Sequence, residues 1–200
     1  MKIGRLQAVF LGLCLVAFGC APKFTGAVYE DGAPLHCLEV VVPAFEWLAS
    51  EDTLYIEHGL EAGKDSPGGG PPSGSEVAVW AVDALNAQGI RARVVDEVSD
   101  IETAGVCVLL GRVESWKERI GSSWSVSRSA SVSFRVALIE ASTRRVLWAE
   151  EFEEKQQPLS DNLLAIGRFF SHKAQWVTAR TLFEEGCRGL FGSLKGAMTP

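Results

Sequence analysis

Hydrophobic residues change their spacing along the chain, and each spacing predicts an element. Residues 38–45 form an almost continuous apolar, β-branched run, which is typical of a strand covered on both faces. From the N-cap candidate Ser75, apolar residues recur at helical spacing as far as Gly89, which is placed to end the helix. Residues 90–95 and 106–113 predict two further strands. A helix between two strands implies a right-handed crossover and therefore a parallel pair.

The following segment has the period of a half-buried strand. Apolar and polar side chains alternate in residues 130–138, which predicts a strand with one solvated face. A turn at 141–144 separates this run from residues 145–152, so the two runs predict an antiparallel hairpin.

The remaining segments supply loops and two C-terminal helices. Residues 63–74 contain eight Gly or Pro among twelve, which predicts a loop, and residues 99–103 predict one short helical turn. After the hairpin, a short helix is expected at 163–170 and a longer one, with an apolar stripe, at 176–194. The predicted order is β-α-β-(α)-β-β-β-α-α. It indicates one α/β domain at residues 36–195, in which helices pack on a mixed sheet of about five strands.

The first nineteen residues have the composition of an export signal. Lys2 and Arg5 precede the apolar stretch 6–16, and small residues follow it. A transmembrane helix needs roughly 20 apolar residues to cross a bilayer core of about 30 Å, so this stretch is short for a permanent span. Residues 1–19 are therefore predicted to be a signal peptide that is removed.

The segment Ala17-Phe18-Gly19-Cys20 resembles the lipobox of bacterial lipoproteins. The resemblance implies that Cys20 carries fatty acyl chains such as palmitate and becomes the mature N-terminus, with residues 20–35 as a tether. Ala21 after the cysteine implies, by similarity to enteric lipoproteins, an anchor at the periplasmic face of the outer membrane. An ordinary signal peptide with an incidental cysteine, and an uncleaved anchor, are the alternatives.

Charge narrows the range of partners. The composition, 47% hydrophobic and 22% charged, is that of a globular chain. Removal of residues 1–19 leaves 17 basic and 25 acidic residues, a net charge of −8. Nucleic acid is not an expected partner, because phosphate binding needs a basic surface. The same net charge argues against attraction to anionic lipid headgroups.

Three cysteines remain in the domain after Cys14 and Cys20 are accounted for. Cys37 and Cys187 lie near the two ends of the domain and are a candidate disulfide in an exported protein. Cys107 lies in an apolar run, which favours a buried, unpaired thiol.

The order of elements is similar to that of the TolB N-terminal domain, a domain type that also occurs in the curli secretion lipoprotein CsgG and the penicillin-binding-protein activator LpoB. The similarity spans about residues 36–190 and is carried by the segments 41–45, 109–113 and 142–148. It implies membership of envelope assembly or transport machinery, by analogy of fold. A pore-forming role is not expected, because the chain lacks extra amphipathic strands.

No catalytic, cofactor or metal motif stands out. The segment 59–65 departs from a phosphate-binding loop in spacing and in its Asp at the hydroxyl position. No Gly-x-Ser-x-Gly nucleophile turn is present in the sequence. The histidines do not have the spacing of a zinc site: His36, His58 and His172. An acidic run at the end of the hairpin is interpreted as a solvated face rather than as paired catalytic carboxylates: Glu150, Glu151, Glu153 and Glu154.

Two of the six tryptophans are candidate partner contacts. Trp80 and Trp176 lie on helix stripes and are expected in the core, which leaves Trp116 and Trp124 as surface candidates. The sequence therefore predicts a lipid-anchored, non-catalytic accessory or scaffold of an envelope complex, without cofactor or metal. A homo-oligomeric secretion component and a murein- or glycan-directed protein are the alternatives.

Overall fold

The computed structural model describes residues 35–48, 71–98, 101, 103–123, 126–156 and 176–198. Within these ranges, a mixed sheet of six strands has the order β3-β1-β4-β7-β8, with β2 beside β4. Its strands are β1 Glu39–Val42, β2 Glu46–Trp47, β3 Ala92–Val94, β4 Val106–Lys117, β7 Ser131–Glu140 and β8 Val146–Lys155. The pair β5 Ile120–Gly121 and β6 Val126–Arg128 forms a small second sheet, and the helices are α2 Gly74–Ala87 and α4 Ala179–Met198. The α/β fold class predicted from the sequence is confirmed.

The parallel half of the sheet follows the predicted crossover. β1 lies between β3 and β4 and runs parallel to both, with Val41 aligned to Arg93 on one side and to Val108 on the other. The three valines of β1 are fully buried, as its continuous apolar run predicts. The predicted strand 38–45 is divided, however, since Pro43 and Ala44 separate β1 from the two residues of β2.

The antiparallel half is built on β4, β7 and β8. The alternation predicted for β7 is confirmed, because Val132, Phe134, Val136 and Leu138 are all buried. β4 runs four residues beyond its predicted end at Val113, and a bulge between Val113 and Ser115 shifts its register. Because a one-residue shift reverses the facing of a strand's side chains, the bulge aligns Trp116 with buried Val132.

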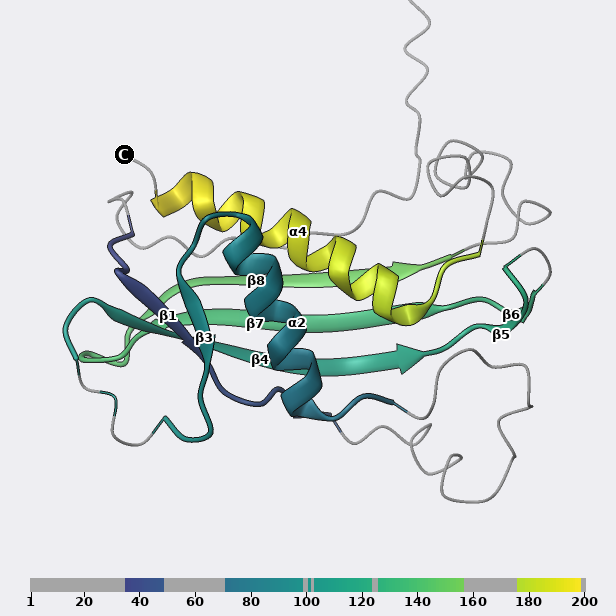
Figure 1. Ribbon diagram of the computed structural model, residues 1–200, viewed down its shortest axis with the longest axis horizontal. Coiled ribbons are helices and arrows are strands. Elements are labelled where there is room, and N and C mark those ends of the chain that lie inside the picture. Colours follow the sequence, from purple (N-terminus) through teal and green to yellow (C-terminus); the bar gives the residue numbers. More distant parts are fainter. Residues whose placement is uncertain are drawn as a thin grey trace, which may run out of the picture.

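Both helices cover the same face of the sheet (Figure 1). α2 begins earlier than predicted, at the last glycine of the 63–74 loop, with Ser73 and not Ser75 as its N-cap. Ser73 and Glu76 form a reciprocal capping box, and the hydrogen bonds from Ser73 lower the pKa of the Glu76 carboxyl. Gly89 follows the helix with a φ of 79°, so its predicted role at the helix end is confirmed.

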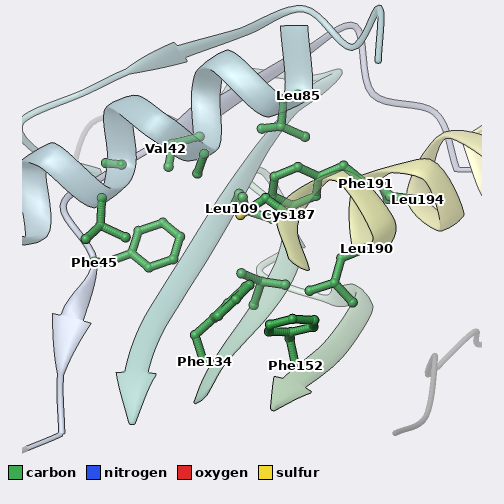
Figure 2. Close-up of a cluster of buried hydrophobic side chains, with 14 of the residues drawn as sticks. Val42, Phe45, Leu85, Leu109, Phe134, Phe152, Cys187, Leu190, Phe191 and Leu194 are labelled. Carbon is green, nitrogen blue, oxygen red and sulfur yellow. The ribbon is translucent and has the colours of Figure 1, made fainter. Parts of the chain in front are cut away.

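One hydrophobic core fills the space between the helices and the sheet. Figure 2 shows side chains of α2, α4 and the strands pointing into this shared interior. Gly186 of α4 lets the helix approach the sheet, since a Cβ at this position would lie 2.7 Å from Phe152 Cδ1. Gly111 of β4 similarly leaves space for the Phe45 ring, which would overlap an added Cβ.

Several predictions concern residues outside the described ranges. The signal peptide, Cys20, the tether to 34, Trp124 and the short helix at 163–170 all lie there, as does most of the predicted turn at 99–103. Among the helices that the structure describes, none is both long and apolar enough to cross a membrane.

The predicted disulfide between Cys37 and Cys187 is wrong in this structure. Cys37 is instead bonded to Cys107, with 5.8 Å between the Cα atoms. Cys37 lies just before β1, and β1 pairs with β4 so that Val40 is aligned with Cys107. Cys187 lies on the inner face of α4, fully buried and free, and burial raises the pKa of its thiol well above its ordinary value, with a smaller contribution from Glu184. Cys107 is buried as expected, but it is not an unpaired thiol.

Candidate partner-binding surfaces

The two faces of the sheet differ in what covers them. The helices cover one face, whereas the loop after β3 covers part of the other, through a small cluster around Val41, Val108 and Ala141. Val95, Val98 and Ile101 of this loop pack against that cluster. Beyond the loop, among the described residues, this second face is open, and we call it the open face.

A shallow groove of about 650 Å³ lies on the open face. Its floor includes one row of cross-strand neighbours, Leu110, Ala137 and Ala149, from three adjacent strands. Leu110 is 42% exposed, which is high for a leucine in a central strand. Pro43 and Val98 contribute further apolar surface, so the groove offers an apolar strip to a partner.

The next row of the groove is charged. Arg112 pairs with Glu46 at 3.0 Å, while Arg135 pairs with Glu114 at 2.9 Å and with Glu151 at 3.1 Å. Because the two arginines are aligned on neighbouring strands, these carboxylates also offset their mutual repulsion. The pairs are partly exposed and contribute little to stability, but they give the groove charged groups of both signs. An apolar strip beside mixed charges is typical of a surface that binds a polypeptide.

The acidic run at the end of the hairpin is divided between the two faces. Glu150 is buried on the helix side, where its carboxylate accepts a hydrogen bond of 3.1 Å from Ser193 Oγ of α4. Glu151 faces the open side and Glu153 is exposed. Successive side chains of a strand point to opposite faces, so these neighbours do not form a carboxylate pair. The prediction of a solvated face is correct for Glu153 and wrong for Glu150.

Trp116 lies in an aromatic cluster rather than standing alone on the surface. Its ring stacks on Trp80 at 6.1 Å, lies 6.0 Å from Phe183 and meets Trp47 edge-on at 6.3 Å. The guanidinium of Arg180 lies 4.6 Å from the centre of the Trp80 ring, as a cation–π contact. The three tryptophans are half-buried, so Trp116 contributes to packing and Trp80 is less enclosed than predicted. Trp176, also expected in the core, is half-buried, and its backbone N–H donates to Ser123 O.

The described residues contain no group of His, Cys, Asp and Glu that could hold a metal ion. Of the three histidines, His36 is exposed, and the other two lie outside the described ranges. The groove could not be predicted from the sequence, because the small and apolar residues of its floor have the same pattern as those of any buried strand.

Comparison with known proteins identifies the fold but no family. No family model matches the chain, and no curated protein matches it. A solved structure of a PelC dodecamer from Paraburkholderia phytofirmans has a TM-score of 0.53 at 14% identity, covering 87% of this chain and 97% of that one. The fold of this chain is similar to that of PelC. A second PelC dodecamer structure from the same organism gives a TM-score of 0.51 at 15% identity, with the same coverage of both chains.

A third similar structure carries less weight. The lipoprotein GNA1162 from Neisseria meningitidis aligns over 68% of this chain and 97% of its own, at 14% identity, but its TM-score of 0.29 is too low to support an argument. Identities in this range show similarity of fold alone.

Proposed function

We propose that this chain is a bacterial envelope lipoprotein, held through Cys20 at the periplasmic face of the outer membrane. It acts without catalysis, as an accessory or scaffold of an envelope assembly or transport complex, and it does so as a closed ring of identical copies. The observation that carries the proposal is the similarity of the whole domain to PelC, which was crystallised as a dodecamer.

The two faces of the domain suit a ring. A cyclic assembly of more than two copies joins two different surfaces of each subunit, so that each copy binds the next head-to-tail. The open face, with its exposed Leu110 and its mixed charges, differs from the helix face that carries α2 and α4. We assign the groove as one of the two contact surfaces.

The chemistry of the groove supports a non-catalytic role. Its carboxylates Glu46 and Glu151 are paired with arginines, and Glu150 is hydrogen-bonded to Ser193. Glu46 and Glu151 both line the groove, but each is neutralised by an arginine, and neither arrangement resembles a nucleophile positioned by a base. A glycan-binding role is not proposed, because the face of Trp116 packs on Trp80.

The resemblance to the TolB N-terminal domain and to CsgG and LpoB remains part of the proposal. The crossover β1-α2-β3 followed by an antiparallel hairpin agrees with the element order on which that resemblance was based. The resemblance to these domains supports a role in envelope assembly or transport, whereas the similarity of the fold to PelC supports a homo-oligomer.

The mass of the native particle tests the ring. The acylated protein is extracted in mild detergent, and its mass is measured by native mass spectrometry. A single species with a fixed number of copies is expected, whereas a monomer at native concentration contradicts the ring.

A matched pair of variants tests the groove as the contact. Leu110→Arg and Ile120→Arg each place a charge at a similarly exposed apolar side chain, 42% and 39%, but Ile120 lies in the small second sheet and on neither face of the main sheet. If the groove is a contact surface, Leu110→Arg gives monomers that keep the native circular dichroism spectrum. Intact particles for Leu110→Arg would remove the groove from the proposal, and Ile120→Arg controls for the added charge.

A further inference from the structure

One end of the sheet carries a group of basic side chains that are far apart in the sequence. Backbone pairing places Arg93 of β3 in the same transverse row as Val146 of β8; this row runs through Val41, Val108 and Ile139. Arg91 lies just before β3, while Arg144 and Arg145 lie in the turn just before β8. All four arginines therefore gather at the end of the sheet where β1, β3, β4 and β8 begin, which we call the basic end.

The basic end is also where the chain enters the described domain. The backbone N–H of Leu35 donates to the carbonyl of Ala197 at 3.1 Å, so the first described residue lies beside the last turn of α4. Figure 1 shows the start of β1, the end of α4 and the turn between β7 and β8 on one side of the molecule. A tether that leads from Cys20 to Leu35 therefore reaches the domain at its basic end.

The charge at this end differs from that of the whole chain. The side chains of Arg91 and Arg93 are 82% and 55% exposed, and Arg144 and Arg145 are also exposed. Two of the described residues at the basic end are acidic. They are Glu39, which pairs with Arg91 and Arg93, and Glu140, which accepts a hydrogen bond from Thr143. A chain with a net charge of −8 therefore has a locally basic surface at this end.

Exposed apolar side chains accompany the arginines. Leu38, at the start of β1, is 80% exposed and rests on Gly105, and Val146 is 42% exposed. Basic groups around exposed aliphatic side chains are typical of surfaces that lie on a membrane, where the charges meet headgroup phosphates and the apolar groups enter the interface.

Arg144 lies in the turn between β7 and β8 with a left-handed backbone. Its φ of 57° is in the left-handed region, where glycine or asparagine is the usual residue of a hairpin turn. Glycine can replace Arg144 without a backbone penalty, so the side chain can be removed while the turn is kept.

We propose that the basic end rests on the anionic lipid headgroups of the membrane that holds the protein. The inference rests on the proposed function in one respect, since it takes the lipid at Cys20 as the anchor. Fifteen residue steps from Cys20 to Leu35 span at most about 50 Å, whatever conformation they adopt. The tether therefore keeps the basic end near the bilayer, and attraction to headgroups acts within the last 8–10 Å or so.

Docking by this end fixes the orientation of the domain. The strands then stand upright on the membrane, because the basic end is the end of the strands and not a face of the sheet. The open face is left pointing sideways, where it is free to meet a neighbouring copy.

Vesicle binding without the lipid anchor tests the surface by itself. The mature chain, residues 20–200, is exported by an ordinary signal peptide with the substitution Cys20→Ser, and it is sedimented with vesicles. Binding is expected to vesicles of phosphatidylcholine with phosphatidylglycerol, to be lost in high salt, and to be absent with phosphatidylcholine alone. No binding, or equal binding to both compositions, overturns the proposal.

Two double variants locate the binding site. Arg144→Glu with Arg145→Glu is expected to weaken binding by about tenfold or more, since each basic residue near an anionic surface contributes about fivefold. Lys117→Glu with Lys155→Glu changes the net charge equally at the opposite end, where both lysines are exposed, and binding is expected to be unchanged. Equal loss in the two variants would show a response to net charge only and would overturn the proposal.

Arg144→Gly separates binding from stability. Glycine relieves the left-handed backbone, so this variant is expected to unfold at a higher denaturant concentration while it binds vesicles about fivefold more weakly. Unchanged binding by this variant contradicts the role of the Arg144 side chain. Because the vesicle assay uses protein without acyl chains, it can succeed or fail independently of the anchor at Cys20.

Discussion

Cys37 and Cys107 are joined by a disulfide that closes a loop across 70 residues of sequence, where β1 enters the sheet beside β4. The bond ties the residue that precedes the first strand to the central strand, which pairs with both halves of the sheet. In the proposed anchored protein, the bridge would carry a pull on the chain before Leu35 into the centre of the sheet, rather than into the four-residue strand β1 alone.

Loss of the bridge is expected to reduce stability substantially. A disulfide that closes a long loop restricts the unfolded chain, and its removal typically costs about 2–5 kcal/mol. Cys37→Ser with Cys107→Ser should therefore lower the midpoint of urea unfolding by a corresponding amount. An unchanged midpoint in the double variant, with reductant also without effect on the parent, would contradict the pairing.

Cys187 should behave as an inert thiol. Burial raises the pKa of Cys187, so the thiol stays protonated at neutral pH and is shielded from reagents. In non-reducing buffer, a thiol reagent is expected to label none of the native protein, and one site, Cys187, after unfolding. Labelling at Cys107 instead would restore the original prediction, in which Cys37 pairs with Cys187.

Two glycines of α4 should respond in opposite directions to the same substitution. Gly186→Ala brings a Cβ to 2.7 Å from Phe152 Cδ1, and overpacking of this kind costs about 1–3 kcal/mol. Gly192 lies on the exposed side of the helix, and a Cβ added there has no atom within 4 Å. Gly192→Ala should therefore stabilise the protein by about 0.5–1 kcal/mol, because alanine has the higher helix propensity. Chemical unfolding of both variants measures the difference, and a shift in the same direction for both would argue against the packing of α4 on β8.

The Trp116 side chain is expected to contribute to the stability of the fold. Its ring contacts Trp80, Trp47 and Phe183, so Trp116→Ala removes packing from three neighbours and is expected to cost about 2 kcal/mol or more. Thermal or urea unfolding measures the loss. A variant of unchanged stability would return Trp116 to the role of an exposed partner contact.

Local patterns in the sequence predict most of the architecture correctly. The continuous valines of β1 and the strict alternation of β7 each correspond to one environment, buried on two faces or on one, and both were predicted correctly. The crossover through α2 followed from the order of elements and the handedness rule.

The features that escaped prediction depend on pairing between distant strands. The bulge after Val113 turns Trp116 toward the helices, and a bulge leaves no signal in the hydrophobic pattern of one strand. The partner of Cys37 similarly depends on which strand lies beside β1, and the sequence positions of the three cysteines do not determine it. The basic end is assembled from residues beside β3 and from the turn before β8, so the net charge of the whole chain does not reveal it.

The mass of the native N-terminus tests the account most directly. Protein is extracted from membranes of the source cell, digested, and its N-terminal peptide is analysed by mass spectrometry. The account predicts a peptide that begins at Cys20 and carries fatty acyl chains. A peptide that begins elsewhere, or Cys20 without any fatty acid, would contradict it.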